Sequence, residues 1–237
     1  MKKSEIRLNK YLSDSGVCSR READRLIQQG LVRINGQPVQ MGQKVTSADH
    51  VTVNGRLVRP ADEKVYLLFH KPRGIECTEQ KKVKNNIIQY LNYPVRVTYA
   101  GRLDKDSEGL MLMTNDGDLI NDMMRARNGH EKEYLVTVDK PITEVFLKGM
   151  AQGVPILDTI TRPCTITQTG TYTFRIILTQ GLNRQIRRMC EYFHYKVTKL
   201  KRVRILNLEL GSLPLGKSRP ATDAELTQLF KLLEQEQ

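Results

Sequence analysis

The 237-residue sequence contains no tryptophan and no long apolar segment. A helix that crosses a membrane takes about 20 apolar residues, whereas the longest apolar run here covers only residues 65–69. Two lysines stand near the N-terminus, but no apolar stretch follows them, so we expect no signal peptide. A hydrophobic fraction of 39% is nevertheless enough to form a core. These features exclude a membrane protein and predict a globular protein of the cytoplasm.

Cysteine and histidine are also scarce, with four of each in the chain. The cysteines form no C-x-x-C pair, and no cysteine and histidine stand at the spacing of zinc ligands. The histidines are equally scattered, so we predict no metal site. In a reducing compartment the cysteines are expected to be buried thiols. They are Cys18, Cys77, Cys164 and Cys190.

Acidic residues are in the minority, and the net charge is +12. Residues 1–59 contain 11 Lys/Arg and 5 Asp/Glu, and residues 181–220 contain 10 and 2, so these two segments carry +6 and +8. The rest of the chain is close to neutral or acidic. This concentration of positive charge in two segments favours two surfaces that bind the phosphates of a nucleic acid. The alternative is a pair of basic faces without a partner.

The first sixty residues carry the signals of a small helix-and-strand module. Leu8 and Leu12 share one helical face, and Ser19-Arg-Arg-Glu22 is a capping box that begins a second helix, with Gly30 at its end. Asn35-Gly36 and Asn54-Gly55 predict tight hairpin turns.

This segment resembles the S4 RNA-binding domain, which presents a basic two-helix face to structured RNA. We take the domain as residues 5–58 and the polar, proline-containing segment 59–64 as a linker. Arginines on a rigid helix can bind phosphates without reading sequence, although a solvated helix face would have the same composition. The resemblance implies RNA contacts by Arg7, Lys10, Arg20, Arg21 and Arg25.

Residues 65–237 mix strand and helix signals without a strict alternation. Short turns join many of the strands, which favours an α+β domain with a mixed, mostly antiparallel sheet flanked by helices over a doubly wound parallel sheet. A second capping box, at Thr222 and Glu225, predicts the start of the last helix. The predicted strands are 65–69, 95–99, 109–114, 133–138, 173–179, 196–200 and 203–208, and the predicted helices are 118–126, 143–152, 184–194 and 222–235.

The most distinctive segment of this domain is the polar loop Gly101-Arg-Leu-Asp-Lys-Asp-Ser-Glu-Gly-Leu110. It contains three acids, Asp104, Asp106 and Glu108, and on composition alone it could be a solvated turn. Arg102 lies two residues before Asp104, and the flanking glycines would allow a ligand or another backbone to approach closely. These two features favour a functional site in this loop over a solvated turn.

The pattern Gly-Arg-Leu-Asp-x-x-Ser-x-Gly-Leu in this loop resembles the signature of the RsuA/RluA-type pseudouridine synthases. The resemblance covers nearly the whole chain, and the S4-like module is typical of the RsuA branch. Within that branch the chain is most similar to the RluF type, which modifies 23S rRNA. Three further family blocks occur in the right order, at His70-Lys-Pro-Arg-Gly74, Lys132-Glu-Tyr134 and Gly181-Leu-Asn-Arg-Gln-Ile-Arg-Arg-Met189.

The resemblance implies site-specific isomerisation of uridine to pseudouridine. The bond from ribose to a ring nitrogen is broken, the uracil turns, and ribose is rejoined to a ring carbon. Neither redox chemistry nor group transfer occurs, so no cofactor is required. The site needs a carboxylate, a group that holds its charge and a platform for the detached base. The target base must also leave the helical stack.

The same resemblance assigns three catalytic residues. Asp104 is the essential aspartate, as nucleophile or base; Tyr134 stacks on the flipped base; and Arg187 pairs with the aspartate, which would lower the pKa of the carboxyl group. Outside the family context, Tyr134 could be an ordinary strand tyrosine and Arg187 a surface residue. Asp106 and Glu108 receive no catalytic role, since the family works with one carboxylate.

Further RNA contacts are implied for Arg102, Lys71, Arg184 and Arg188. Arg102 would enter the duplex as the base leaves, or would instead form a local ion pair with Asp106 or Glu108. The expected partner is a 23S rRNA stem-loop bound by a monomer. Alternatives are 16S rRNA or tRNA as substrate, or a non-catalytic RNA-binding protein of ribosome assembly.

Overall fold

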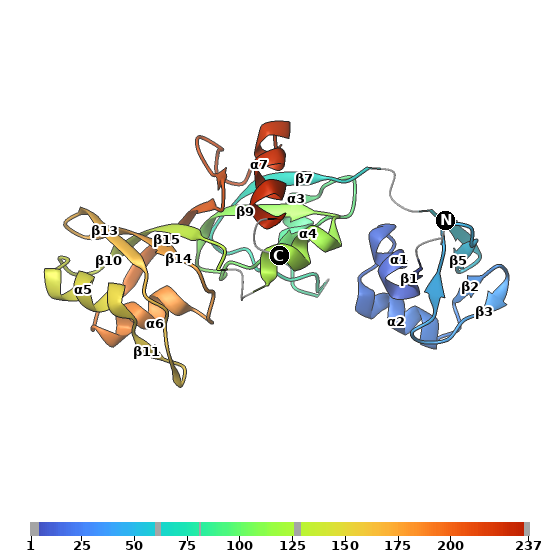
Figure 1. Cartoon of the computed structure of the whole chain (residues 1–237), viewed down its shortest axis with the longest axis horizontal. Helices are drawn as coiled ribbons and strands as arrows, with labels where there is room; N and C mark the ends of the chain where they lie inside the picture. The colour runs from blue at the N-terminus through green and yellow to red at the C-terminus, as the bar shows by residue number, and fades with distance from the viewer. Residues whose placement is uncertain (1–4, 60–62, 81, 126–128, 235–237) are drawn as a thin grey trace. The chain divides into compact units, whose positions relative to one another are not determined.

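The computed structural model describes residues 5–59, 63–80, 82–125 and 129–234 (Figure 1). The chain forms two compact units: residues 1–65 with 93–97 and 115–117, and the remainder. Of the predicted linker 59–64, residues 60–62 lie outside the described residues, as do the last residues of the predicted helices 118–126 and 222–235. None of the described helices combines the length and the apolar content that crossing a bilayer requires.

The first unit packs two helices against short strands. Its core contains Leu8 and Leu12 from the first helix and Ala23 and Ile27 from the second, all 4% exposed or less. The strands form an antiparallel sheet of order β3-β2-β5-β6 and a separate pair, β1 with β4. The elements are β1 (Ile6–Arg7), α1 (Leu8–Asp14), α2 (Arg20–Gln28), β2 (Val32–Ile34), β3 (Gln37–Pro38), β4 (Lys44–Val45), β5 (Val51–Val53) and β6 (Arg56–Val58).

Local sequence signals determine where these elements begin and end. The Ser19 hydroxyl accepts a hydrogen bond from the Glu22 amide at 3.2 Å, which caps α2 as predicted. Asn35 and Asn54 have φ of 50° and 49°, and the glycine after each also has positive φ. Both predicted Asn-Gly turns are therefore present between paired strands.

The described part of the second unit forms a nine-stranded sheet of order β13-β14-β10-β15-β9-β7-β17, with β16 added to β15 and β8 to β9. Every pair is antiparallel except β9 with β15. The predicted mixed, mostly antiparallel sheet is confirmed. Its strands are β7 (Tyr66–Lys71), β8 (Thr98–Ala100), β9 (Glu108–Thr114), β10 (Lys132–Val138), β13 (Thr165–Gly170), β14 (Thr173–Leu178), β15 (Val197–Ile205), β16 (Leu208–Glu209) and β17 (Ser218–Pro220).

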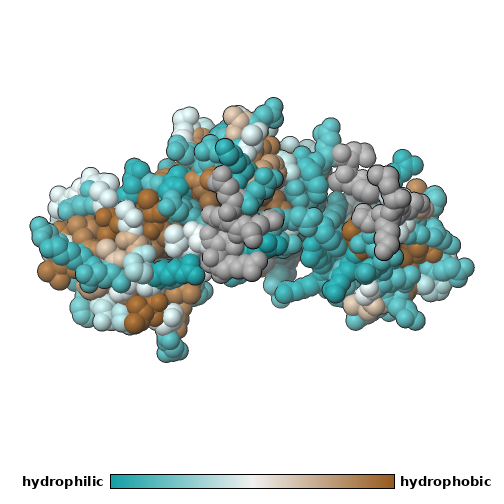
Figure 2. All heavy atoms as spheres, viewed as in Figure 1, coloured by the Kyte–Doolittle hydropathy of each residue, from teal (hydrophilic) through white to brown (hydrophobic). Residues whose placement is uncertain are grey.

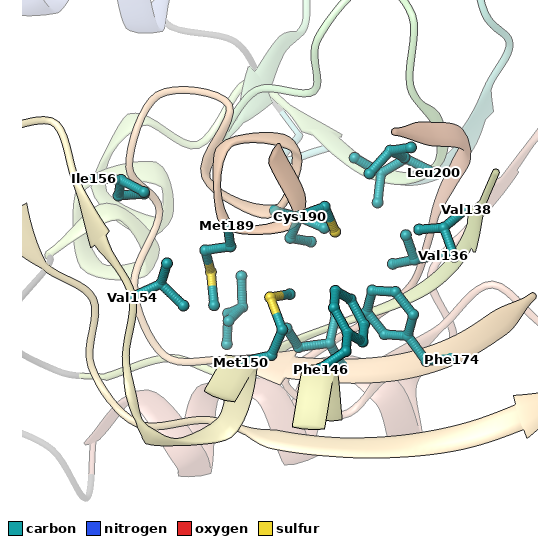
Figure 3. Close-up of a cluster of buried hydrophobic side chains, with 14 residues drawn as sticks. Val136, Val138, Phe146, Met150, Val154, Ile156, Phe174, Met189, Cys190 and Leu200 are labelled. Atoms are coloured by element: carbon teal, nitrogen blue, oxygen red, sulfur yellow. The ribbon is translucent and has the colours of Figure 1, made fainter. Parts of the chain in front are cut away.

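Two apolar cores stabilise this sheet. In one, shown in Figure 3, side chains of α5 and α6 such as Phe146 and Met189 pack against Val136, Phe174 and Leu200 of the sheet. In the other, α4 and α7 pack against β7 and β9. The helices are α3 (Ile87–Leu91), α4 (Gly117–Met124), α5 (Glu144–Gln152), α6 (Gln185–Tyr192) and α7 (Asp223–Glu234); a separate hairpin joins β11 (Pro155–Ile156) to β12 (Thr159–Ile160).

One prediction about the sheet is wrong. The expected strands 196–200 and 203–208 are largely one strand, β15, which pairs with β10 over its whole length through two register shifts. The residues between the two predicted strands, Lys201 and Arg202, are paired with Leu135 and Tyr134 of β10 like the rest of the strand. The five-residue helix α3 was not predicted, because it is too short to show a helical period. The second capping box is confirmed: Thr222 and Glu225 each bond the other's backbone amide, at 3.2 and 2.8 Å.

Candidate active site

The loop between β8 and β9 carries Asp104 and borders a cavity of about 500 Å³. The Asp104 side chain is 34% exposed and lines this cavity. The loop ends at Gly109, which is paired with Arg202 where β9 runs beside β15. A Cβ at Gly109 would lie 2.2 Å from the Arg202 carbonyl oxygen, and φ is +124°. The second glycine of the motif is thus explained by a close approach of two strands.

Lys71, at the end of β7, is completely buried beneath this loop. Its Nζ donates hydrogen bonds to the carbonyl oxygens of Ser107 at 2.8 Å, Pro72 at 3.0 Å and Asp104 at 3.1 Å. Burial lowers the pKa of Lys71, with the charge of Cys77 and Asp104 opposing the shift. The expectation that Lys71 contacts RNA is wrong, because an ammonium with no exposed surface and three backbone acceptors is not available to a phosphate.

Arg187, on α6, supports the same loop from another side. Its guanidinium donates to the carbonyl oxygens of Asp106 at 3.1 Å and Val197 at 3.2 Å and to the Ser107 hydroxyl at 3.4 Å. It is 9% exposed, so it is not the surface residue that its helix position alone would suggest. Burial lowers the pKa of Arg187, and Arg184 lowers it further, while Asp104 opposes the shift.

The ion pair with Asp104 is formed by Arg184, not by Arg187 as expected. One guanidinium nitrogen of Arg184 lies 3.9 Å from a carboxylate oxygen of Asp104, and the Arg184 side chain is 41% exposed. Arg184 precedes α6 with φ of 50°, a conformation that is uncommon for a residue other than glycine. Arg188, one turn further, is partly exposed and donates to the Asn183 carbonyl at 3.1 Å.

Tyr134 lies on β10 and lines the same cavity, with its side chain half-buried against the adjoining apolar core. Lys132, two residues earlier on the strand, shares this face. Its Nζ donates to the His130 carbonyl at 3.0 Å, and burial lowers its pKa. The cavity is therefore bordered by a carboxylate, a phenol and an ammonium group.

Arg102 is exposed and lines the rim of the cavity. Within the part of the chain that the structure describes, it forms no ion pair with Asp106 or Glu108, so that alternative is not observed. Cys77 also lines the cavity; its Sγ accepts a hydrogen bond from the Leu103 amide at 3.4 Å. Contrary to expectation, Cys77 and Cys164 are only partly buried, in the former case because its side chain faces this cavity.

The first unit carries its candidate RNA-binding residues on a hydrophilic surface, part of which is seen in Figure 2. Arg7, Arg20 and Arg21 are exposed. Lys10 forms an ion pair with Asp14 at 2.7 Å, and Arg25 pairs with Glu22. The Lys10–Asp14 pair is partly buried, whereas the Arg25–Glu22 pair is exposed, and exposed pairs of this kind are weak.

Comparison with known proteins decides the family. The model of the RNA pseudouridylate synthase family matches residues 65–192, and that of the S4 domain matches residues 6–49. The chain belongs to the RNA pseudouridylate synthase family. It is an isomerase, and the expected fold class is confirmed. Metal-binding clusters are absent from the described residues.

Similar proteins support this membership across the whole chain. "Dual-specificity RNA pseudouridine synthase RluF" of Salmonella typhi is 56% identical over 98% of this chain and 81% of its own length. "Ribosomal large subunit pseudouridine synthase B" of Bacillus subtilis is 34% identical over 95% of this chain and 96% of its own. A solved structure titled "Crystal structure of pseudouridylate synthase" has a TM-score of 0.70 and 29% identity, and covers 94% of this chain and 99% of that one.

Sequence reasoning missed one residue that lines this candidate site. Arg202 lines the cavity and is 2% exposed. Alternation along β15 places it on the same face as Leu200, which is also buried. An arginine at an inward position of a strand could have indicated a functional residue. The predicted break after residue 200 concealed that Arg202 faces inward.

Proposed function

We propose that this chain isomerises a uridine of 23S rRNA to pseudouridine, at a stem-loop from which the target base can leave the stack. The B. subtilis relative is named for the large ribosomal subunit, and this name supports the choice of rRNA. A tRNA is the second candidate substrate. Relatives 54–56% identical are named as having dual specificity for RNA, which is compatible with a second substrate class. We further propose that the enzyme acts as a monomer in the cytoplasm.

The observation that carries the catalytic proposal is a partly exposed carboxylate on the wall of a cavity that also contains a tyrosine. Asp104 acts as nucleophile or base while the glycosidic bond breaks, and Tyr134 stacks on the detached uracil. The new bond joins ribose to the ring carbon, whose proton is then removed, and the released ring nitrogen takes up a proton. The guanidinium of Arg187 holds the loop that carries Asp104 by a hydrogen bond to the backbone carbonyl of Asp106. A binding-only protein would not need this set intact.

RNA binding is divided between two regions in this proposal. Residues 5–58 form the S4 module, 59–64 the linker and 65–237 the catalytic domain. Exposed cations bind phosphates and contribute affinity that falls with salt. The proposed contacts are Arg102, Arg184 and Arg188 beside the cavity, and Arg7, Lys10, Arg20, Arg21 and Arg25 in the S4 module.

The test is a single-turnover assay with 23S rRNA, 16S rRNA and tRNA transcripts, in which pseudouridine is mapped at each position. We expect one product site in 23S rRNA, and a loss of about 10³-fold or more for Asp104→Asn. Asp106→Asn is the matched control, since Asp106 is an exposed acid of the same loop. Its rate should equal that of the wild type.

Each part of the proposal has its own contrary result. A wild-type rate in Asp104→Asn would overturn the catalytic assignment. Product in tRNA or 16S rRNA alone would overturn the substrate while leaving the chemistry intact. An unchanged pseudouridine profile in rRNA of cells lacking the protein would favour the binding-only alternative.

A further inference from the structure

Arg202 lies at the wall of the catalytic cavity and is one of the most deeply buried large side chains of the protein, with 2% exposure. Its Nε donates to the Leu110 carbonyl at 2.8 Å. One terminal nitrogen lies 3.5 Å from the Arg102 carbonyl and the other 3.0 Å from the Met111 sulfur. Only one of these three contacts is a short hydrogen bond to oxygen.

This guanidinium has no acidic partner among the residues that the structure describes. Burying a cation without a carboxylate is unfavourable, and an apolar side chain of similar size is often as stable or more stable. A thioether is also a weak acceptor. Fold stability therefore does not account for an arginine at this position, and a role in the cavity does.

The position of Arg202 connects the strand that carries Tyr134 with the loop that carries Asp104. On one side, β15 places it directly opposite Tyr134 of β10, and directly opposed side chains lie close together. On the other side, its guanidinium contacts the carbonyls of Arg102 and Leu110, which bracket the loop that carries Asp104. The backbone of Arg202 also contacts this loop. Because Gly109 has no side chain, the end of the loop can lie directly against Arg202 of β15.

We propose that Arg202 is a positioning residue of uridine isomerisation, which fixes the distance between the Asp104 carboxylate and the Tyr134 ring. The inference rests on the proposed roles of those two residues. A flexible or shortened side chain would leave the fold intact but allow the Asp104 loop to move relative to Tyr134. A misplacement of about 1 Å at a catalytic group can lower the rate about 10²-fold.

The experiment compares Arg202→Met, Arg202→Lys and the control Lys199→Met, which removes an exposed cation from the same strand. For each variant, the single-turnover rate at saturating RNA, the Kd for RNA and the thermal midpoint are measured. We expect the rate of Arg202→Met to fall about 10²-fold, with Kd unchanged. Loss of the donor to the Leu110 carbonyl can lower the thermal midpoint, so the rate loss should persist at temperatures well below that midpoint. Arg202→Lys keeps the charge but not the two-carbonyl contact, so its rate should be intermediate. Lys199→Met should behave as the wild type.

Three results would overturn the inference. One is a wild-type rate in Arg202→Met. Another is a rate loss that accompanies a lower midpoint and disappears on cooling, which would make the residue merely structural. The third is a raised Kd with an unchanged saturated rate, which would make it an RNA contact. Failure of the proposed function itself is recognised separately, because Asp104→Asn would then retain the wild-type rate.

Discussion

Replacing Lys71 by methionine separates a structural cation from an RNA-binding one. The side chain has no exposed surface, and its ammonium group donates to three backbone carbonyls at 2.8–3.1 Å. Methionine has a similar length but offers no donor. The substitution therefore leaves the carbonyls of Pro72, Asp104 and Ser107 without this partner, in a place that water reaches poorly.

The size of the effect follows from these contacts. An orphaned buried acceptor costs about 1–3 kcal/mol, and three of them outweigh the relief from no longer burying an ammonium group. We expect a net loss of about 3 kcal/mol in the free energy of unfolding. For a domain of this size, 1 kcal/mol corresponds to roughly 2–4 °C, so the thermal midpoint should fall by roughly 6–12 °C.

Calorimetry of the full chain measures this change, with Lys105→Met as the control. Lys105 belongs to the same loop but is exposed, so its loss should change stability by no more than about 0.5 kcal/mol. RNA affinity is then measured at several salt concentrations. If Lys71 bound a phosphate, the variant would lose one phosphate contact. The slope of log Kd against the logarithm of the salt concentration would then be smaller by about 0.7–0.9. An unchanged midpoint, or a weaker salt dependence, would refute the reasoning.

The pH dependence gives a second check on Lys71. Burial lowers the pKa of this lysine below its usual value of 10.5. Between the lowered value and 10.5, the unfolded chain binds more protons than the folded protein, so this residue makes stability rise with pH. The free-energy difference between wild type and Lys71→Met should grow over that window, as followed by urea unfolding at a series of alkaline pH values.

Three other substitutions test neighbouring parts of the structure. Gly109→Ala would place a Cβ 2.2 Å from the Arg202 carbonyl oxygen, and urea unfolding should show a loss of about 3 kcal/mol or more. Arg184→Gln should reduce the slope of log Kd for RNA against the logarithm of the salt concentration by about 0.7–0.9, with little change in thermal midpoint. The hydrogen bond from Arg219 lowers the pKa of Glu225 to about 2 from its usual 4.5. The carboxylate therefore stabilises the fold above pH 4.5, by about 1 kcal/mol after allowance for solvent. The stability difference between wild type and Glu225→Gln should disappear as pH falls from 4.5 towards 2.

The sequence specified local structure well where the responsible residues are close together in the chain. Ser19 and Glu22 cap a helix three residues apart, and each Asn-Gly pair forms its turn without help from distant residues. The same holds for the capping box at the start of α7. Hydrophobic alternation also predicted most strands of the sheet. It failed at β15, which was predicted as two strands, and at β13, which was not predicted because its side chains are mostly polar and exposed.

Contacts between residues far apart in the sequence could not be predicted from local patterns. Family motifs identified Lys71 and Arg187 as part of the site, but not which atoms they bind. Lys71 is 33 residues from Asp104, whose carbonyl it contacts, and Arg187 is 81 residues from Asp106. Only the strand order and the packing of α6 bring these groups together. The family resemblance therefore placed both residues near Asp104 but did not show that Lys71 and Arg187 bind the backbone of its loop.

The three buried cations share one property that bears on catalysis. Lys71, Arg187 and Arg202 all donate to backbone carbonyls of the loop, and none of them bonds the carboxylate of Asp104. A short, buried ion pair would hold the carboxylate and lower its basicity. Hydrogen bonds to the carbonyls of the loop instead support the backbone at Asp104 and leave its carboxylate oxygens exposed to the cavity. The one ion pair that Asp104 forms in the described chain, with Arg184, is long and exposed. A phosphate that drew Arg184 away would therefore free the carboxylate as the RNA binds.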